Sequence, residues 1–343
     1  MSLFIKKIKS FLVYILTGRK ETFTFKNDSY SSKLYTPYYN CTSIMESVKP
    51  KIFNIDGELM DTWFIRDEHS AHCPYRETSK YFLWDRYNFG LDTHFYTHES
   101  MLETMGKPTN RYGLFVESEF IVPESYKIFE KNTGLHKDFD KIFTYSEELL
   151  DKIPNAKLFT SCATLWYGQE KGCDITLSDT VYLKKTKNVS MVCSNKVMTE
   201  FHRIRHDFAN EAKKLGTVDI YGSYNNGEYL KYKSTSLQEY RFQIVVENGI
   251  APYYFTEKIL DCFGAMTIPI YLGASKVSMF FNEKGIIFLD IKDVNNLDRV
   301  ISRCNEKLYE EMLPYVIENY HKVLKYKNMN DRLYEENFIT NKI

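Results

Sequence analysis

Residues 247–258 read ENGIAPYYFTEK, and they place carboxylates, an amide, tyrosines and a lysine between two apolar runs. Glycine and proline interrupt the segment, and Thr256 is a residue type that caps helix N-termini. The free backbone N–H groups and the dipole of such a helix start favour a bound phosphate. Lys258 adds a positive charge, and Glu257 can accept hydrogen bonds from hydroxyls such as those of a ribose. The segment therefore predicts a pocket for a nucleotide that carries a sugar.

The flanking residues predict that this helix follows a strand of a parallel sheet. Residues 240–248 (YRFQIVVEN) alternate and are rich in β-branched side chains, which is typical of a strand that ends at Glu247 and Asn248. The apolar spacing of residues 257–265 indicates a helix, and TIPIYLG at 267–273 indicates the next strand. The helix start is therefore expected at the carboxyl edge of the sheet, where parallel α/β proteins bind ligands.

Strand and helix patterns alternate along the rest of the chain. Strands are predicted at 51–55, 112–119, 188–195 and 217–222, a strand followed by a helix over 139–153, and a helix over 200–216 that ends at Gly216. Such alternation predicts parallel α/β units. A domain boundary is expected between about residues 165 and 187, with two Rossmann-like halves and the site in the crevice between them.

The composition narrows the class of protein. The chain has 343 residues, 43% of them apolar and 16% aromatic, which predicts a globular protein of two domains. Lys plus Arg and Asp plus Glu are balanced at 45 each, so no overall charge draws the chain to nucleic acid. The seven cysteines form no C-x-x-C pair. They are interpreted as reduced thiols of a cytoplasmic protein.

Residues 1–20 form a basic segment with an apolar centre at 11–16. That centre is shorter than the roughly 20 residues that span a bilayer. No small-residue cleavage site follows it, which argues against a removable signal peptide. Two interpretations stay open: an amphipathic helix on the inner face of an anionic membrane, or a helix docked on the first domain.

The segment 240–273 resembles the signature of glycosyltransferase family ten, the α1,3/α1,4-fucosyltransferases. That signature has tyrosine and phenylalanine, then Glu-Asn, a variable loop, tyrosine, Thr-Glu-Lys, and an isoleucine- or valine-flanked proline followed by glycine. Asn248, Tyr254, Glu257 and Lys258 match it without a gap. The segments VSMVCSN with a following arginine, VDIYG, and GLFVESE with DFDKIFTYSEEL are similar to further elements of the family.

The resemblance implies an α/β fold of GT-B type, with two Rossmann-like domains facing a central cleft. An acceptor-side domain is then expected over residues 21–175, after the segment 1–20. A nucleotide-sugar-binding domain with the terminal helices is expected over 176–343. The implied enzyme is an inverting glycosyltransferase that moves L-fucose from GDP-fucose onto a hydroxyl of a glycan, with no metal or other cofactor required. Another GDP-linked sugar and a lipid-linked acceptor stay open as alternatives.

The resemblance also implies roles for individual residues. Glu117, at the end of a strand in the first domain, is the implied general base, with Glu119 on the same strand face as the alternative. The arginine for the diphosphate falls in EFHRIRHDF, where Arg203 and Arg205 compete and Arg205 has the better distance to Val218. Lys258 is placed on the diphosphate. The residues implied to hold the nucleotide are Asn195, Arg203, Glu247, Asn248, Tyr254, Glu257 and Lys258.

These residue types suit glycosyl transfer with inversion. A single carboxylate such as Glu117 can take the proton of the acceptor hydroxyl. Arg205, Lys258 and a helix N-terminus can stabilise the charge of the departing diphosphate, as a metal ion does in other enzymes.

Two pairs of histidines are candidate metal ligands, and each pair also has an interpretation that involves no metal. His69 and His72, followed by Cys73, have ligand-like spacing but lack an evident fourth ligand, so a polar loop near the acceptor is favoured over a zinc site. His94 and His98 are four residues apart on an expected helix. They lack the H-E-x-x-H order and are interpreted as packing or surface histidines.

Two other classes of function stay open. Asp138 and Asp140 imitate the metal-binding D-x-D of GT-A enzymes, which would make the protein a metal-dependent transferase of another nucleotide sugar. Because they directly precede a predicted strand, a solvated turn is favoured. A catalytically inactive protein that binds sugar nucleotides is the second alternative, and the intact Thr-Glu-Lys set argues against it.

Overall fold

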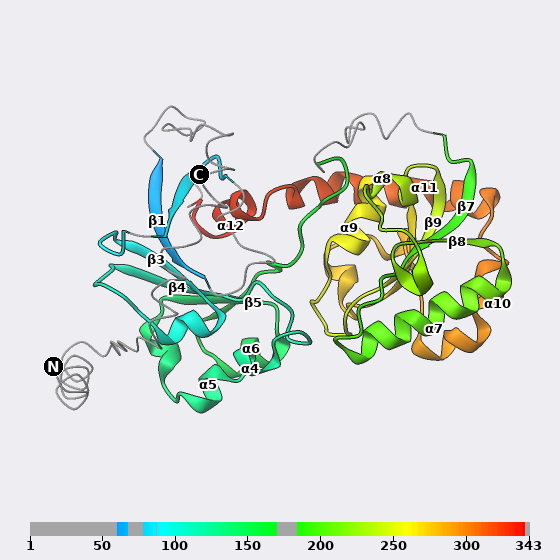
Figure 1. Cartoon of the computed structure of the whole chain (residues 1–343). Coiled ribbons are helices and arrows are strands. Elements are labelled where there is room, and N and C mark those ends of the chain that lie inside the picture. Colours follow the sequence, from blue (N-terminus) through cyan, green and yellow to red (C-terminus); the bar gives the residue numbers. More distant parts are fainter. Residues whose placement is uncertain (1–59, 68–77, 87, 170–183, 340–343) are drawn as a thin grey trace. The chain divides into compact units, whose positions relative to one another are not determined.

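The computed structural model describes residues 60–67, 78–86, 88–169 and 184–339 of the chain (Figure 1). The chain divides into two compact units, one of residues 1–161 with 328–343 and one of residues 162–327. Several predicted features lie outside the described residues: the segment 1–20, the strand at 51–55, and His69, His72 and Cys73.

The first unit contains a six-stranded sheet in the order β2-β1-β3-β4-β5-β6. Its strands are β1 (Asp61–Arg66), β2 (Phe82–Asp85), β3 (Thr93–Thr97), β4 (Asn110–Leu114), β5 (Lys141–Thr144) and β6 (Ala156–Leu158). All neighbouring strands are parallel. The order reverses between β1 and β3, which is the topological switch point of a doubly wound sheet.

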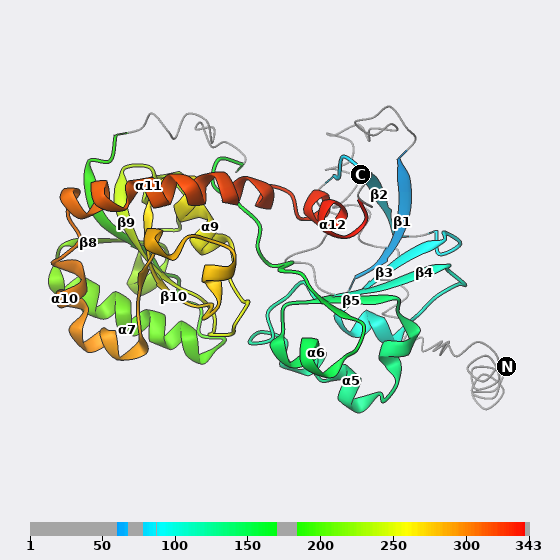
Figure 2. The same cartoon turned by 180° about the vertical axis from the view of Figure 1, so that it is seen from behind.

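Short helices and one helix from the end of the chain cover this sheet. They are η2 (His98–Leu102), α4 (Pro123–Tyr126), α5 (Ile128–Lys131), η3 (Leu135–Asp138), α6 (Glu147–Lys152) and α12 (Met329–Asn337). Figure 2 shows α12 on the opposite side of the sheet from α5 and α6. Met329 and Leu333 of α12 pack into the same buried cluster as Trp63, Phe95 and Phe143 of the strands.

The second unit contains a five-stranded sheet in the order β11-β10-β9-β7-β8, again with all neighbours parallel. Its strands are β7 (Lys187–Val192), β8 (Val218–Tyr221), β9 (Tyr240–Val246), β10 (Ile268–Leu272) and β11 (Ile287–Phe288). Taken in chain order, this is the same winding as in the first five strands of unit one. Here the order reverses between β7 and β9.

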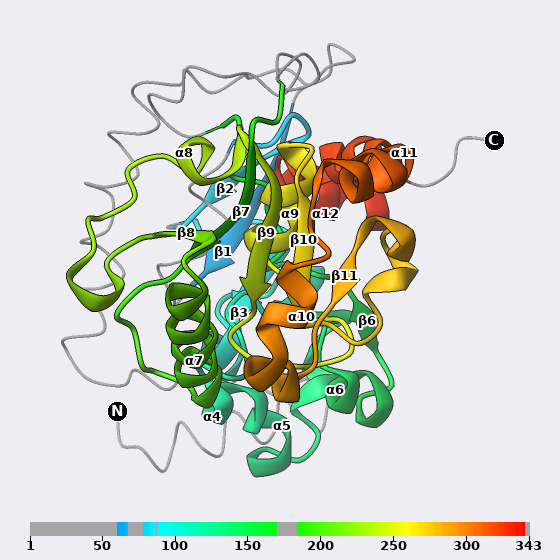
Figure 3. The ribbon, with the colours of Figure 1, turned by 90° about the vertical axis from the view of Figure 1, so that its right-hand side faces the viewer.

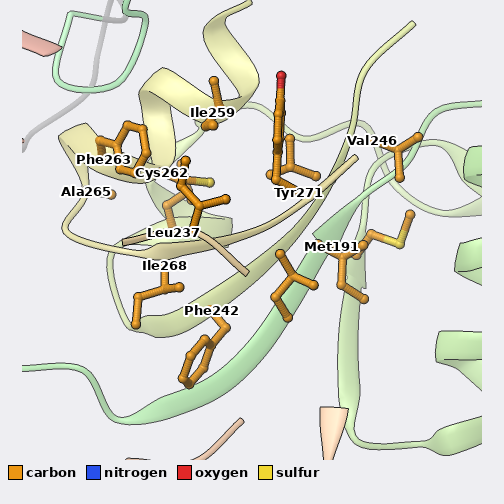
Figure 4. Close-up of a cluster of buried hydrophobic side chains, with 14 of the residues drawn as sticks. Met191, Leu237, Phe242, Val246, Ile259, Cys262, Phe263, Ala265, Ile268 and Tyr271 are labelled. Atoms are coloured by element: carbon orange, nitrogen blue, oxygen red, sulfur yellow. The ribbon is translucent and has the colours of Figure 1, made fainter. Parts of the chain in front are cut away.

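Helices lie on both faces of this second sheet. The α-helices are α7 (Glu200–Leu215), α8 (Ser234–Leu237), α9 (Glu257–Gly264), α10 (Leu297–Ile301) and α11 (Glu306–Val323). The 3₁₀ helices are η5 (Tyr224–Asn226), η6 (Val277–Met279), η7 (Glu283–Gly285), η8 (Ile291–Asn296) and η9 (Leu324–Tyr326). α7 and α10 cover one face, and α9 and α11 cover the other (Figures 1 and 3). Ile259 and Phe263 of α9 lie over side chains of β9 and β10 in the core (Figure 4).

Two doubly wound parallel sheets confirm the predicted α/β class with two Rossmann-like domains. The predicted strands and helices from residue 112 to 273 are present. α7 ends as expected at Gly216, whose φ of 66° is the left-handed conformation that glycine adopts readily.

Two predictions about particular residues were wrong. His94 and His98 do not share a helix: His94 lies on β3 and His98 begins η2, and both are fully buried. The surrounding aromatic residues favour a buried strand over a helix. Asp138 does not lie in a solvated turn but is 2% exposed at the end of η3. Asp140 is exposed and accepts a hydrogen bond from the Arg111 N–H at 2.7 Å.

Candidate functional site

The predicted nucleotide residues gather at the switch point of the second sheet. β7 and β9 are neighbours, so the loops that follow them, residues 193–199 and 247–256, leave the same carboxyl edge. The Thr199 hydroxyl oxygen lies 3.1 Å from the Asn248 carbonyl oxygen, which brings the two loops into contact. Doubly wound sheets bind ligands at this place because the flanking loops diverge there.

Glu247 is the buried anchor of the site. It has no exposed surface, its Oε1 accepts the Thr256 N–H at 2.9 Å, and its Oε2 accepts the Thr256 hydroxyl at 2.8 Å. Lys258 Nζ lies 3.2 Å from the same Oε2. A buried carboxylate is tolerated only with such partners. A Cβ at Gly273 would lie 2.6 Å from the Cγ of Glu247, so this position needs a glycine.

Lys258 is held at the first turn of α9. Besides Glu247, its ammonium lies 2.9 Å from the Thr256 hydroxyl oxygen and 3.3 Å from Glu257 Oε1. Thr256 also caps α9, since its hydroxyl accepts the Lys258 N–H. The Lys258 side chain is 23% exposed. A positive charge is therefore fixed beside a helix N-terminus and can reach a bound anion.

Arg205 fixes the end of β9 from α7. Its Nε and Nη2 donate to the Val246 carbonyl at 2.9 and 2.6 Å, and Nη2 donates to Asn248 Oδ1 at 2.9 Å. Arg205 is buried, whereas Arg203 is exposed. The structure thus brings Arg205, and not Arg203, together with Asn248.

His202, which is not among the predicted site residues, shares a capping box with Thr199. Thr199 caps α7 by accepting the His202 N–H at 3.3 Å, and His202 Nδ1 accepts the Thr199 N–H at 3.2 Å. Burial, with Arg205 and Lys258 as further causes, lowers the pKa of His202 to about 4. The ring is therefore neutral at pH 7. The signal for it was the Thr-x-x-His spacing, in which histidine replaces the usual glutamate or glutamine.

The other predicted nucleotide residues differ in exposure. Asn195 is exposed, and its Oδ1 accepts the Asn225 N–H at 3.2 Å, which ties the loop after β7 to the loop after β8. Tyr254 is 1% exposed and Glu257 is 8% exposed. Asn195, Asn248 and Lys258 thus present surface to a ligand, while Glu247 and Tyr254 support the site from within.

The predicted base, Glu117, lies in the first unit, three residues after β4. Its N–H donates to His98 Nε2 at 2.8 Å, and its carbonyl accepts the hydroxyls of Tyr126 and Tyr145, each at 2.7 Å. Its carboxylate is partly exposed and accepts the Ser118 N–H at 2.8 Å. The backbone is thus held firmly while the carboxylate stays within reach of solvent.

Glu119 has a different electrostatic setting. Burial raises the pKa of its carboxyl group, a hydrogen bond from Ser146 opposes the shift, and the charge of Glu148 adds to it. The prediction that both glutamates lie on one strand face was wrong, because β4 ends at Leu114. Both glutamates follow the strand, and both stay candidates for the base.

The described residues contain no group of three or more His, Cys, Asp or Glu side chains placed to hold a metal ion. In the same part of the chain, no helix combines the length and apolar character that a membrane span needs. Four cysteines, Cys162, Cys193, Cys262 and Cys304, are buried free thiols, as predicted for them.

Residues 182–336 match the C-terminal domain of glycosyltransferase family 10 (fucosyltransferase). An alpha-(1,3)-fucosyltransferase of Helicobacter pylori is 36% identical over 100 residues, which are 29% of this chain and 20% of that protein. Alpha-(1,3)-fucosyltransferase B of Drosophila melanogaster is 28% identical over 151 residues, 40% of this chain and 33% of that one. The chain thus spans a third or less of the length of these relatives.

Among solved structures, an alpha1,3-fucosyltransferase with GDP aligns with a TM-score of 0.48 at 17% identity. The alignment covers 82% of this chain and 93% of that one. An alpha1,3-fucosyltransferase with GDP-fucose aligns with a TM-score of 0.47 at 17% identity, over 88% of this chain and 96% of that one.

Proposed function

We propose that this chain, whose residues 182–336 match the C-terminal domain of glycosyltransferase family 10, is an inverting fucosyltransferase of the α1,3/α1,4 type that uses GDP-fucose. The observation that carries the proposal is the cluster of Lys258, Glu247, Arg205 and Asn248 at the switch point of the second sheet. A cationic helix start at that edge is suited to a nucleotide diphosphate. The two relatives described above are named alpha-(1,3)-fucosyltransferases.

In this proposal the diphosphate binds at the start of α9 beside Lys258. Asn248 faces the nucleotide in the orientation set by Arg205, and Glu257 accepts hydrogen bonds from sugar hydroxyls. Glu247 acts through Lys258 and Thr256, because it is fully buried. Arg203 is the alternative arginine for direct contact with the diphosphate, since its side chain is exposed.

The proposed reaction needs one proton acceptor and stabilisation of one leaving group. The acceptor hydroxyl oxygen attacks C1 of fucose and its proton passes to Glu117, while the bond from C1 to the β-phosphate oxygen breaks and GDP leaves. Attack opposite the leaving group inverts the configuration at C1. Lys258 and the α9 N-terminus stabilise the charge that develops on GDP, so the reaction is proposed to require no metal.

A donor panel tests this function without a known acceptor. GDP-fucose, GDP-mannose, UDP-galactose and UDP-glucose are incubated with the full chain, and slow hydrolysis is followed with and without a chelator. We expect hydrolysis of GDP-fucose above the other donors, unchanged by the chelator. Loss of activity in chelator would favour the GT-A alternative with Asp138 and Asp140. GDP binding without any turnover, even with a range of glycans, would favour an inactive binding protein.

We further propose that the acceptor is a glycan and that the protein is cytoplasmic with peripheral contact to a membrane. The basic and apolar sequence of residues 1–20 supports the contact. The full chain should sediment with anionic vesicles, and a chain that lacks residues 1–20 should not, while donor hydrolysis is unchanged. A full-length chain that never sediments with such vesicles would contradict the membrane contact.

A further inference from the structure

His202 occupies a buried position at the start of α7 with one ring nitrogen already used. The residue is 3% exposed, and its Nδ1 accepts the Thr199 N–H at 3.2 Å. A neutral imidazole has one donor and one acceptor nitrogen. Nδ1 also lies 2.7 Å from the Thr199 hydroxyl oxygen, which can donate its proton to Nδ1. With both Thr199 groups donating to Nδ1, we assign the ring proton to Nε2.

Nε2 of His202 has no hydrogen-bond partner among the described residues, and it is not one of their buried unpaired atoms. Nε2 is thus not fully buried, although the residue as a whole is 3% exposed, and it can take a hydrogen-bond partner from a ligand. An almost fully buried side chain rarely leaves a hydrogen-bond donor unused unless a ligand or a water molecule accepts from it.

The charges around the ring indicate what kind of group would complete it. After burial, the charges of Arg205, Lys258, Lys196 and His206 lower the pKa of His202, and all four side chains are basic. Lys258 belongs to α9, across the site from α7, and Thr199 links the ring to Asn248. Because the His202 imidazole is neutral, its N–H can donate to a bound anion here, and no further charged side chain has to be removed from water.

We propose that the Nε2–H of His202 donates a hydrogen bond to the diphosphate of the bound nucleotide sugar, opposite Lys258. This inference rests on the proposed function, because it requires a nucleoside diphosphate in the site. The inference adds His202 as a residue that binds the donor and that is not part of the fucosyltransferase signature at residues 240–273. The bound diphosphate favours the protonated ring, so binding at mildly acidic pH takes up a proton at His202.

Two substitutions separate contact with the ligand from helix capping. Glutamine and glutamate are the usual residues at this capping-box position, so His202→Gln and His202→Glu both keep the cap of α7. His202→Gln should bind GDP about 3- to 10-fold more weakly, the worth of one neutral hydrogen bond. His202→Glu places a negative charge against the phosphates and should bind GDP about 100-fold more weakly or worse. The two variants should have similar melting temperatures.

Calorimetry with GDP, GMP and guanosine gives the readout. The ratio of affinities between His202→Gln and His202→Glu should be large for GDP, smaller for GMP and near one for guanosine. If both variants bind GDP within about twofold of the wild type, His202 is a capping residue only and the inference is wrong. A wild-type chain that binds no GDP would instead overturn the proposed function.

A spectroscopic readout tests the same contact in the unaltered protein. The imidazole signals of His202, assigned with the His202→Gln variant, are titrated by NMR with and without GDP. The pKa of His202 should rise when GDP binds and should stay unchanged with guanosine. An unchanged pKa with GDP bound would show that the diphosphate does not face Nε2.

Discussion

The charge of Lys258 has two roles, and replacing this lysine tests both of them. It neutralises the buried carboxylate of Glu247 at 3.2 Å, and it presents its charge at the start of α9. We expect Lys258→Ala to weaken GDP binding by about 1.5–3 kcal/mol, the scale of a hydrogen bond to a charged group. Isothermal titration calorimetry measures this loss.

The matched control is Lys307→Ala, which removes a lysine that is 86% exposed on α11. Its GDP affinity should equal that of the wild type, because exposed ion pairs contribute little. Lys258→Ala also leaves Glu247 without its cationic partner, so the variant should melt at a lower temperature. Unchanged GDP affinity in a folded Lys258→Ala variant would remove Lys258 from the donor site.

Glu117 is the residue that separates catalysis from binding. Glu117→Gln keeps the size of the side chain and the acceptor for the Ser118 N–H, but the amide cannot take a proton. Transfer should fall by roughly 10²-fold or more, while GDP affinity is unchanged. The measurement compares initial rates of fucose transfer with calorimetric GDP binding.

Glu119→Gln is the paired control for this prediction. In the proposed reaction Glu117, and not Glu119, takes the proton of the acceptor hydroxyl. The transfer rate of Glu119→Gln should therefore fall much less than that of Glu117→Gln. The reverse pattern would move the base two residues along the chain, and mild losses in both variants would point to deprotonation by water or substrate.

The helices of the second unit show what local sequence can predict. Thr256 and Gly216 mark the start of α9 and the end of α7, and both signals act through backbone groups within a few residues. The choice between Arg203 and Arg205 could not be made from local sequence. It depends on which face of α7 meets the end of β9, and that contact is made with residues about 40 positions away.

The first unit gave weaker local signals for the same reason. His94 and His98 have helical spacing, but His94 lies on β3, which is stabilised by parallel pairing with β1 and β4. His98 then turns the chain with a positive φ of 47° and holds the backbone of Glu117. Propensity and spacing cannot show such tertiary pairing.

α9 is also anchored at its middle, by Asp261. This carboxylate is 1% exposed and accepts the N–H groups of Trp166 and Tyr167, each at 2.8 Å. Burial raises the pKa of Asp261 to about 7, although the charge of Lys233 opposes the shift. Because the folded value lies above the ordinary value, protonation stabilises the folded state, and this contribution is lost as pH rises through about 7.

Asp261→Asn should remove this pH dependence, because the amide keeps an acceptor oxygen and carries no charge. We compare melting temperatures of wild type and variant at pH 5.5 and pH 8. The difference in melting temperature, wild type minus variant, should decrease by about 2 °C or more from pH 5.5 to pH 8. Other titrating groups cancel in this difference. Parallel curves for the two proteins would show that Asp261 stays ionised throughout.

The two units have the same strand winding, yet the chain does not complete them one after the other. Residues 328–339 return to the first unit after the second is finished. The apolar spacing of α12 shows that one of its faces is buried, but it carries no information on which sheet covers that face. For this reason the sequence placed the terminal helices with the second domain, whereas the contacts group residues 328–343 with the first.

Several contacts tie α12 to the first unit. Asp331 Oδ1 accepts the Ser79 hydroxyl at 2.9 Å, and Arg332 Nη2 donates to the Thr160 carbonyl at 2.6 Å. Tyr334 stacks on Tyr81 with ring centroids 4.6 Å apart. Leu333 has no exposed surface. The first unit therefore needs the end of the chain to close its core.

Removing residues 328–343 should unfold the first unit and spare the second. Truncating a buried leucine or methionine costs about 2–5 kcal/mol, and Met329 and Leu333 are both buried. Their combined loss approaches the roughly 5–15 kcal/mol that stabilises a whole domain. Hydrogen exchange followed by mass spectrometry should show lost protection in residues 78–161 and retained protection in residues 187–323. A chain that lacks only residues 340–343 is the control and should keep both. If protection in the second unit falls as well, the two units do not fold independently, and if neither changes, α12 is dispensable to the core.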